Sequence, residues 1–103
     1  MKEKVVFMKY STIGNRVNYS NNLAGVVEDE VPKYERFDDR DYLELVQYIK
    51  WDEGRHSIRI CYYVLNHKSK NKKWRFSNRP LSLKPSKFAQ LLRKASEKKW
   101  FKI

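Results

Sequence analysis

Cysteine is nearly absent from this chain of 103 residues, with Cys61 the single example. One cysteine cannot form an internal disulfide, and such a composition is typical of a reducing, intracellular compartment. We expect a cytoplasmic location, with a nucleoid or a nucleus as alternatives. The only soft metal ligands are Cys61, His56 and His67, whereas a structural zinc site usually has four. The sequence therefore predicts no metal and no other cofactor.

Long apolar runs are also missing. No stretch approaches the roughly 18 apolar residues that a membrane-spanning helix needs. The first residues, MKEKVVFMKYSTIGN, hold a short apolar patch and no small-residue cleavage site, so we expect no secretory signal. A membrane protein is excluded at this level, and one domain over residues 1–103 is the natural expectation.

Acidic residues are scarce in the second half of the chain. Residues 55–103 carry 15 basic side chains and one acidic side chain, Glu97, whereas residues 1–54 carry 8 basic and 11 acidic ones. Like charges at this density repel one another, and a phosphate backbone would offset the repulsion while releasing counterions. The asymmetry predicts a polyanionic partner. A basic surface that is merely solvated is the alternative.

The pattern of residues 57–83 is typical of strands. Residues 57–65, SIRICYYVL, fit a strand in which alternate side chains point to opposite faces of the sheet. The set predicted to face the core is Ile58, Ile60, Tyr62 and Val64. This assignment places Arg59 and Tyr63 together on the opposite, outer face. Residues 66–73 form a lysine-rich loop, residues 74–79 resume the alternation, and Leu81-Ser82-Leu83 is predicted as a short final strand.

A helix is predicted to start at Pro85, which needs no backbone donor in the first turn. Apolar residues then recur at helical spacing and predict a stripe that covers one face of the sheet. They are Phe88, Leu91, Leu92 and Ala95. The two aromatic residues Trp100 and Phe101 follow, and we expect them to pack, against a second subunit if not within the chain.

The first 40 residues are predicted as an extension of the core. Residues 4–10 read as a strand, with a turn at 13–15 and a return strand at 16–19. A loop is expected at 18–25, and the acidic residues 28–41 are expected to be irregular because they contain Pro32. This acidic segment is either a solvated connection or a flap that competes with nucleic acid for the basic half.

Residues 41–51, DYLELVQYIKW, fit either a half-buried strand or a helical stripe. We favour the strand because Asp52-Glu53-Gly54 then forms a short hairpin connection to the next strand.

Basic and aromatic residues are interleaved on these predicted strands. Bases stack on exposed aromatic rings regardless of sequence, while lysine and arginine hold the phosphates between them. The predicted nucleic-acid-binding residues are Tyr48, Lys50, Arg59, Tyr63, Lys68, Lys70, Lys72, Lys73, Trp74, Arg75 and Arg79. The alternative is that the aromatic residues belong to the core and that only the charges are exposed.

No catalytic motif stands out. His56 lies close in sequence to Asp52 and Glu53, as in a nuclease or an acid–base pair, but these carboxylates fall in a predicted turn. Cys61 has basic neighbours and no base of its own. We therefore do not expect an enzyme.

The segment RPLSLKPSKFAQLLRKA, residues 79–95, resembles the strand-into-helix signature of the positive cofactor four (transcriptional coactivator) C-terminal-domain family. The matching features are Arg79, Leu81-Ser82-Leu83, Pro85 and Phe88, and SIRICYYV is similar to the family's central strand. The resemblance covers roughly residues 42–98. It implies four antiparallel strands and a helix, dimerisation through the helix, and single-stranded DNA on the concave sheets.

Three features depart from the family pattern. The hairpin at 66–73 lacks the family's glycines, Lys84 offers no acceptor as a helix cap, and residues 1–40 have no counterpart.

The sequence thus predicts an α+β fold, with an antiparallel four-stranded sheet followed by a C-terminal helix and an extra N-terminal hairpin or loop region. Residues 1–40 would form the extension with its acidic loop, and residues 41–103 the strand-rich core and helix. The predicted function is binding of single-stranded DNA or RNA by a homodimer without strong sequence specificity, in transcription or DNA maintenance. The alternative is a protein-interaction or inhibitor module whose basic half docks on an acidic partner.

Overall fold

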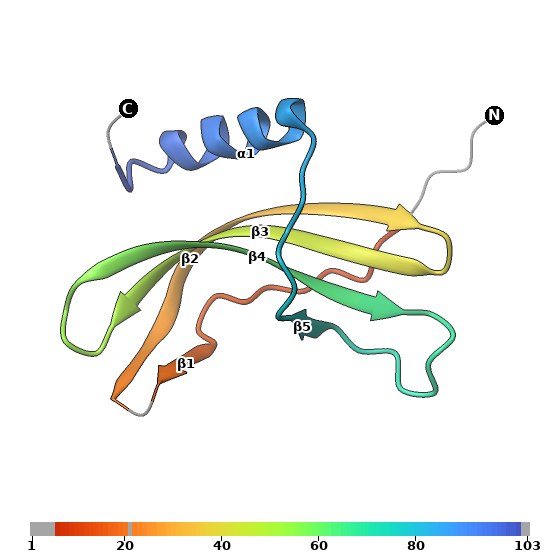
Figure 1. The fold of residues 1–103 in the computed structure, drawn as a ribbon, viewed down its shortest axis with the longest axis horizontal. Helices are drawn as coiled ribbons and strands as arrows, with labels where there is room; N and C mark the ends of the chain where they lie inside the picture. The colour runs from red at the N-terminus through yellow and green to blue at the C-terminus, as the bar shows by residue number, and fades with distance from the viewer. Residues whose placement is uncertain (1–5, 21, 102–103) are drawn as a thin grey trace.

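The computed structural model describes residues 6–20 and 22–101. Within them the chain forms five strands and one helix: β1 (Arg16–Ser20), β2 (Leu23–Phe37), β3 (Arg40–Trp51), β4 (His56–Asn66), β5 (Arg75–Ser77) and α1 (Pro85–Glu97). The strands make one curled antiparallel sheet in the order β1-β2-β3-β4-β5 (Figure 1). The predicted α+β fold with a C-terminal helix is confirmed, and the sheet has one strand more than the expected four.

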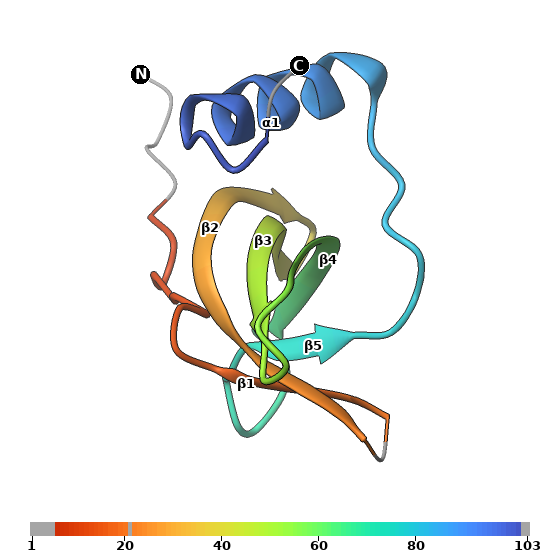
Figure 2. The same ribbon diagram turned by 90° about the vertical axis from the view of Figure 1, so that its left-hand side faces the viewer.

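The sheet lies between two layers. Helix α1 crosses one face, and the segment before β1 runs along the other (Figures 1 and 2). We call these the helix face and the inner face. On the helix face, Val31 and Val46 pack against Leu91 and Ala95 of the helix. Of the apolar stripe predicted in the helix, Leu91 and Ala95 thus cover the sheet, whereas Phe88 and Leu92 are 45% and 38% exposed.

The inner face holds two apolar clusters. Towards β1, Val17 and Val27 pack with Ile49 and Trp51. The second cluster lies under β3 and β4 and consists of Leu43, Leu45, Cys61 and Tyr63, with Tyr10, Tyr34 and Trp74 packed against it. Side chains alternate between the faces of a strand, and both faces are covered here, so β3 is buried along most of its length.

Residues 6–15 form the N-terminal segment, which closes the inner face. Tyr10 and Tyr34 are joined twice, since Tyr10 N donates to Tyr34 Oη at 2.9 Å and Tyr34 Oη donates to Tyr10 O at 3.0 Å. Trp74 Nε1 donates to Met8 O at 2.9 Å. A strand was predicted at residues 4–10, but residues 6–10 are not a strand, and residues 4 and 5 lie outside the described part.

The acidic segment predicted as a loop or flap is instead strand β2, and this prediction was wrong. Its residues pair with β3 from Gly25↔Trp51 to Phe37↔Arg40. Pro32 fits because β1 pairs only with Leu23–Val26, so that at Pro32 the other edge of β2 has no neighbouring strand in the described chain. Gly25 also lies in the strand, where a Cβ would stand 2.6 Å from Lys50 O.

Strand β2 has one irregularity, where its pairing with β3 shifts between Val27 and Asp29. Val27 belongs to an inner-face cluster, and Glu28 is the additional residue. Beyond the shift, Glu30 bonds Thr12 on the inner face and Val31 packs under the helix. Such bulges increase the local twist, which suits a curled sheet.

The two faces of β4 are the reverse of those predicted. Cys61, Tyr63 and Leu65 are buried on the inner face, whereas Ile58 and Ile60 are 43% and 46% exposed. The alternation was read correctly, but aliphatic character did not identify the covered side. Helix α1 packs over β2 and β3, so the isoleucines lie beside the helix and are only partly covered by it.

The C-terminal part follows the prediction in outline. Strand β3 confirms the choice of strand for residues 41–51, and β1 confirms a strand at 16–19, although its partner is β2. The predicted strand at residues 74–79 is confined to β5, and Leu81–Leu83 is not a strand but part of the linker to α1. Lys84 makes no side-chain cap, as expected. No helix in the described residues is long and apolar enough to cross a membrane.

Candidate nucleic-acid interface

An open, basic hollow lies where β4, β5 and the loop between them meet the start of β3. Its volume is about 360 Å³, which is within the range of small-molecule sites. Four cationic side chains line it: Arg40, Lys73, Arg75 and Arg79. The remaining lining comes from Val64, Asn66, Ser69, Asn71, Phe76, Ser77 and Asn78, so no carboxylate is among the lining residues. We call this feature the basic hollow.

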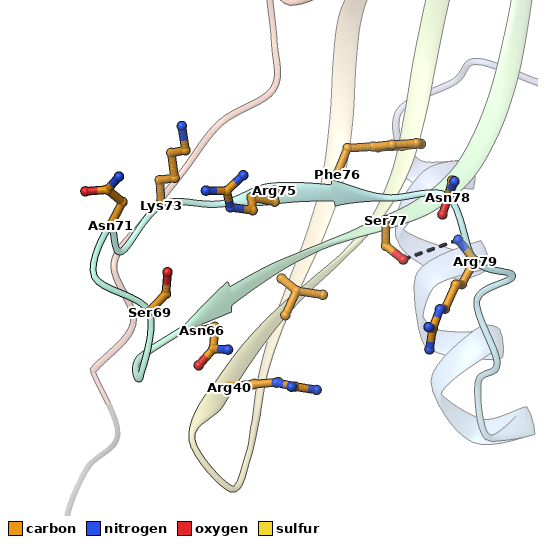
Figure 3. A pocket seen from close by; sticks show the side chains of 11 residues that line it. Arg40, Asn66, Ser69, Asn71, Lys73, Arg75, Phe76, Ser77, Asn78 and Arg79 are labelled. Carbon is orange, nitrogen blue, oxygen red and sulfur yellow. Dashed lines mark hydrogen bonds between the residues drawn. The ribbon is translucent and has the colours of Figure 1, made fainter.

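Strand pairing brings the arginines of the basic hollow together. Arg40 opens β3 opposite Asn66 at the end of β4, and Arg75 of β5 lies opposite Val64. Arg79 follows two residues after β5, where its backbone N–H donates to Ser77 Oγ at 3.3 Å. Arg40, Asn66 and Arg79 extend on one side of β5, while Lys73 and Phe76 extend on the other (Figure 3).

The cations of the basic hollow are available for a ligand. All four side chains are exposed, and none of them forms a salt bridge with another residue of the described chain. Arginine guanidinium groups bind phosphate through paired N–H donors, and lysine adds a point charge. The amide and hydroxyl groups beside them can donate to phosphate oxygens or bond sugar and base atoms.

Phe76 is an exposed aromatic ring at the rim of the basic hollow. It is 48% exposed, and Arg59 lies over its ring at 5.0 Å from the centroid. Arg59 Nε also donates to Gln47 Oε1 at 2.9 Å, which orients the guanidinium on the inner face. One face of Phe76 is thus engaged by a cation, and the ring makes an edge-to-face contact with Tyr63 at a centroid distance of 5.5 Å.

The three predicted stacking residues have partners within the chain. Tyr48 lies between two parallel rings, His56 at 4.6 Å and Trp100 at 5.1 Å. Tyr63 is buried and meets Tyr10 edge-on. Trp74 is partly buried and donates to the N-terminal segment. The structure therefore does not bring these rings together as one open stacking surface, and Trp100 packs within the chain.

The predicted lysines fall in two places. Lys68, Lys70, Lys72 and Lys73 are exposed in the loop between β4 and β5, next to the basic hollow. Lys68 Nζ lies 3.3 Å from Asp39 Oδ2. Lys50 is at the other end of β3, beside Tyr48, and pairs across the sheet with His56. Lys50 and Tyr48 thus lie apart from the other predicted residues.

Two residues of the candidate interface were not predicted. In the sequence Arg40 is flanked by Asp39 and Asp41, and its place in the hollow depends on the pairing of β3 with β4. Phe76 is not among the predicted binding residues, and it is exposed on the edge strand β5. The alternation of residues 74–77 was the one signal for Phe76, and no local signal indicated Arg40.

Other chemistry-bearing groups serve the fold. Buried Asp41 accepts from Arg36 Nε at 2.6 Å and from Arg36 Nη2 at 2.9 Å, and its Oδ2 lies 2.9 Å from His67 Nε2. His56 lies 3.4 Å from Glu28, and Asp52 pairs with Arg16 instead. Burial raises the pKa of the Cys61 thiol, which keeps it protonated. The described residues contain no cluster of ligands suited to a metal.

Comparison of the chain with protein-family models, with curated proteins and with solved structures finds no significant match. The resemblance of residues 79–95 to the positive cofactor four family stays a prediction.

Proposed function

We propose that this protein binds single-stranded DNA or RNA without strong sequence specificity, and that the strand's phosphates lie in the basic hollow and along the lysine loop. The observation that carries the proposal is the set of four cations, Arg40, Lys73, Arg75 and Arg79, that form no salt bridge with the described residues and surround a hollow lined by no carboxylate. Phosphate contacts supply affinity that is independent of sequence.

A single strand fits better than a duplex. The basic hollow is open and is built from strand ends and a loop of a curled sheet, so the cations that line it do not come from a helix of the kind that a major groove admits. Phe76 at the rim can stack an unpaired base, whereas a duplex keeps its base faces internal. The proposal therefore moves the stacking contact from Tyr63 and Trp74 to Phe76.

The test is a fluorescence-anisotropy titration with single-stranded and duplex oligonucleotides of equal length at two salt concentrations. We expect tighter binding to the single strand and a steep loss of affinity with salt. The variant Arg40→Ala/Arg75→Ala/Arg79→Ala should reduce the salt slope by about 2, since each single-strand phosphate contact contributes roughly 0.7.

A charge-matched control separates the hollow from the overall charge. The variant Lys84→Ala/Arg93→Ala/Lys94→Ala loses the same charge from exposed positions at and before α1. Equal losses in the two variants would show a general basic surface and contradict the proposed site. Weak binding to both strands, with one protein co-purifying at fixed stoichiometry, would favour the interaction-module alternative.

We also propose that the binding form is a homodimer. Ile58, Ile60, Phe88 and Leu92 are each more than a third exposed and lie around one apolar groove beside α1. In the described chain β5 pairs only with Tyr62–Val64, so the preceding residues of β4 keep an open edge next to this groove. Light scattering should give twice the chain mass for the wild type and the monomer mass for Leu92→Glu. A monomeric wild type would contradict the proposed homodimer.

A further inference from the structure

Glu44 is a buried carboxylate with one oxygen that is unsatisfied in the described part of the chain. It lies on the helix face of β3 with 4% of its surface exposed, and within the described chain no donor reaches its Oε1. Burial raises the pKa of Glu44, and the nearby ammonium of Lys33, which donates to Gln90, offsets this only in part. An unsatisfied buried acceptor is costly, and a ligand that donates to it removes that cost.

Glu44 also lines a second hollow. Its other lining residues are Glu35, Phe37, Tyr42, Tyr62, Pro80, Leu81 and Ser82, and its volume is about 380 Å³. Tyr42 and Tyr62 face each other across β3 and β4, with centroids 6.1 Å apart and planes at 45°. Glu35 is already paired with Lys87. We call this feature the tyrosine hollow, in which Glu44 is the one carboxylate left without a partner among the residues described.

The tyrosine hollow adjoins the basic hollow. Arg40 and Tyr42 lie two residues apart on the same face of β3, as Val64 and Tyr62 do on β4. Arg79 lines the basic hollow, and the next residue, Pro80, lines the tyrosine hollow. A nucleotide whose phosphate contacts the arginines can therefore place its base against the two tyrosines.

We propose that the tyrosine hollow binds a guanine base of the bound strand, with Glu44 accepting hydrogen bonds from its Watson–Crick edge. This inference rests on the proposed nucleic-acid binding and adds a preferred base to it. Guanine carries two adjacent donors, N1–H and the 2-amino group, which match the two oxygens of a carboxylate. Unpaired bases in single strands are recognised in this way, by stacking and by bonds to that edge.

The other bases fit Glu44 less well. Adenine and cytosine present one amino donor next to a ring-nitrogen acceptor, and thymine presents carbonyl oxygens on both sides of its N–H. Each of these acceptors would face the carboxylate and repel it. A cationic side chain of a partner protein would also satisfy Glu44, but the adjoining cations of the basic hollow disfavour a cationic ligand and favour an anionic chain.

The test compares strands of about 12 thymidines, a length that covers one binding site, with strands that carry one central deoxyguanosine, deoxyinosine or deoxyadenosine. Anisotropy at low salt should show about tenfold tighter binding of the deoxyguanosine strand than of the thymidine strand. Deoxyinosine lacks the 2-amino group and should fall between them. In Glu44→Gln, the ratio between the two strands should fall towards one, while Glu53→Gln, in the exposed turn after β3, should retain it.

The outcomes separate the two proposals. No binding to any strand contradicts the proposed function itself. Equal affinity of the unmodified protein for all four strands leaves nucleic-acid binding intact and overturns the guanine site. A Glu44→Gln variant that weakens every strand by one factor also overturns it. Binding of N-acetylarginine amide that depends on Glu44, without any effect of guanine, would assign the hollow to a protein partner.

Discussion

Asp41 and Glu44 lie three residues apart on β3 and are both almost fully buried, but they point to opposite faces of the sheet. Asp41 faces the inner side, where Arg36 and His67 bond both of its oxygens. Glu44 faces the helix side, where its Oε1 has no partner within the described chain. The neighbouring Arg36 guanidinium lowers the pKa of Asp41, whereas burial raises the pKa of Glu44.

The difference extends to the other polar groups on the two faces of the sheet. On the inner face, the buried polar groups bond one another: Thr12 donates to Glu30, Gln47 donates to Thr12, and Arg59 donates to Gln47. Such a network holds the N-terminal segment against the sheet. On the helix face, Arg40, Arg75 and Glu44 line the two hollows, and none of the three has a salt-bridge partner within the described residues.

The largest effect is expected from Asp41→Asn. The substitution leaves Arg36 without its anionic partner, and breaking a buried ion pair is strongly destabilising. Because the Arg36 side chain is 35% exposed, the loss should be below that of a fully buried pair, roughly 2–4 kcal/mol. Urea unfolding measures it.

Acid unfolding gives a second measure of Asp41. Because the folded-state pKa is lowered, this carboxylate stabilises the fold above its unfolded-state pKa, and the contribution disappears as the pH falls through the folded value. In Asp41→Asn, the free energy of unfolding should therefore decrease less as the pH falls. The control is Asp52→Asn, because the pair of Asp52 with Arg16 is exposed and should contribute little to the free energy of unfolding. Equal effects of the two substitutions would contradict the special role of the buried Asp41.

A smaller effect is expected from Thr12→Val, which keeps the shape but removes the hydroxyl. The hydroxyl donates to Glu30 at 2.6 Å and accepts from Gln47 at 3.0 Å, and all three residues are buried. Leaving these groups unsatisfied should cost about 1–3 kcal/mol in urea unfolding. Thr12→Ser retains the bonds and should lose less; a loss as large as that of the valine variant would assign the effect to packing.

The smallest effect, of opposite sign, is expected from Glu44→Gln. Because the folded-state pKa is raised, the fold favours the protonated carboxyl, and stability falls as the pH rises from the unfolded-state value through the folded value. Glutamine has no such proton to lose, so the variant should show a flatter profile there. At neutral pH it should be more stable by up to about 1 kcal/mol. A variant that is less stable than the wild type would show that the carboxylate is satisfied.

Sequence patterns predicted those strands and the helix whose signals lie within their own residues. Alternation identified β3 and β4, and Pro85 with the stripe through Ala95 identified α1. Strand β2 was missed because its acidic residues find their partners far away in the sequence: Glu30 bonds Thr12, and Glu35 pairs with Lys87. Local composition cannot indicate such partners.

The candidate site was predicted in part for the same reason. The basic loop and strand indicated Lys73, Arg75 and Arg79, because their charge is a local property. The aromatic residues Tyr63 and Trp74 were expected in the open, but the N-terminal segment covers that face. Which face a distant segment covers depends on packing, and the alternation of β4 holds no information about it.

The pairing shift in β2 has a consequence for chain length. Between Gly25 and Phe37, Glu28 is the one residue of β2 without a partner on β3, so we expect the chain to tolerate the loss of a residue there with the other side chains kept on their faces. Deletion of Lys33 would instead move the following side chains of β2 to the opposite faces of the sheet. Glu35 would then lie where Tyr34 now packs with Tyr10 and Trp74. Length variation in this strand is therefore tolerable at one position, and substitutions are the safer way to alter the others.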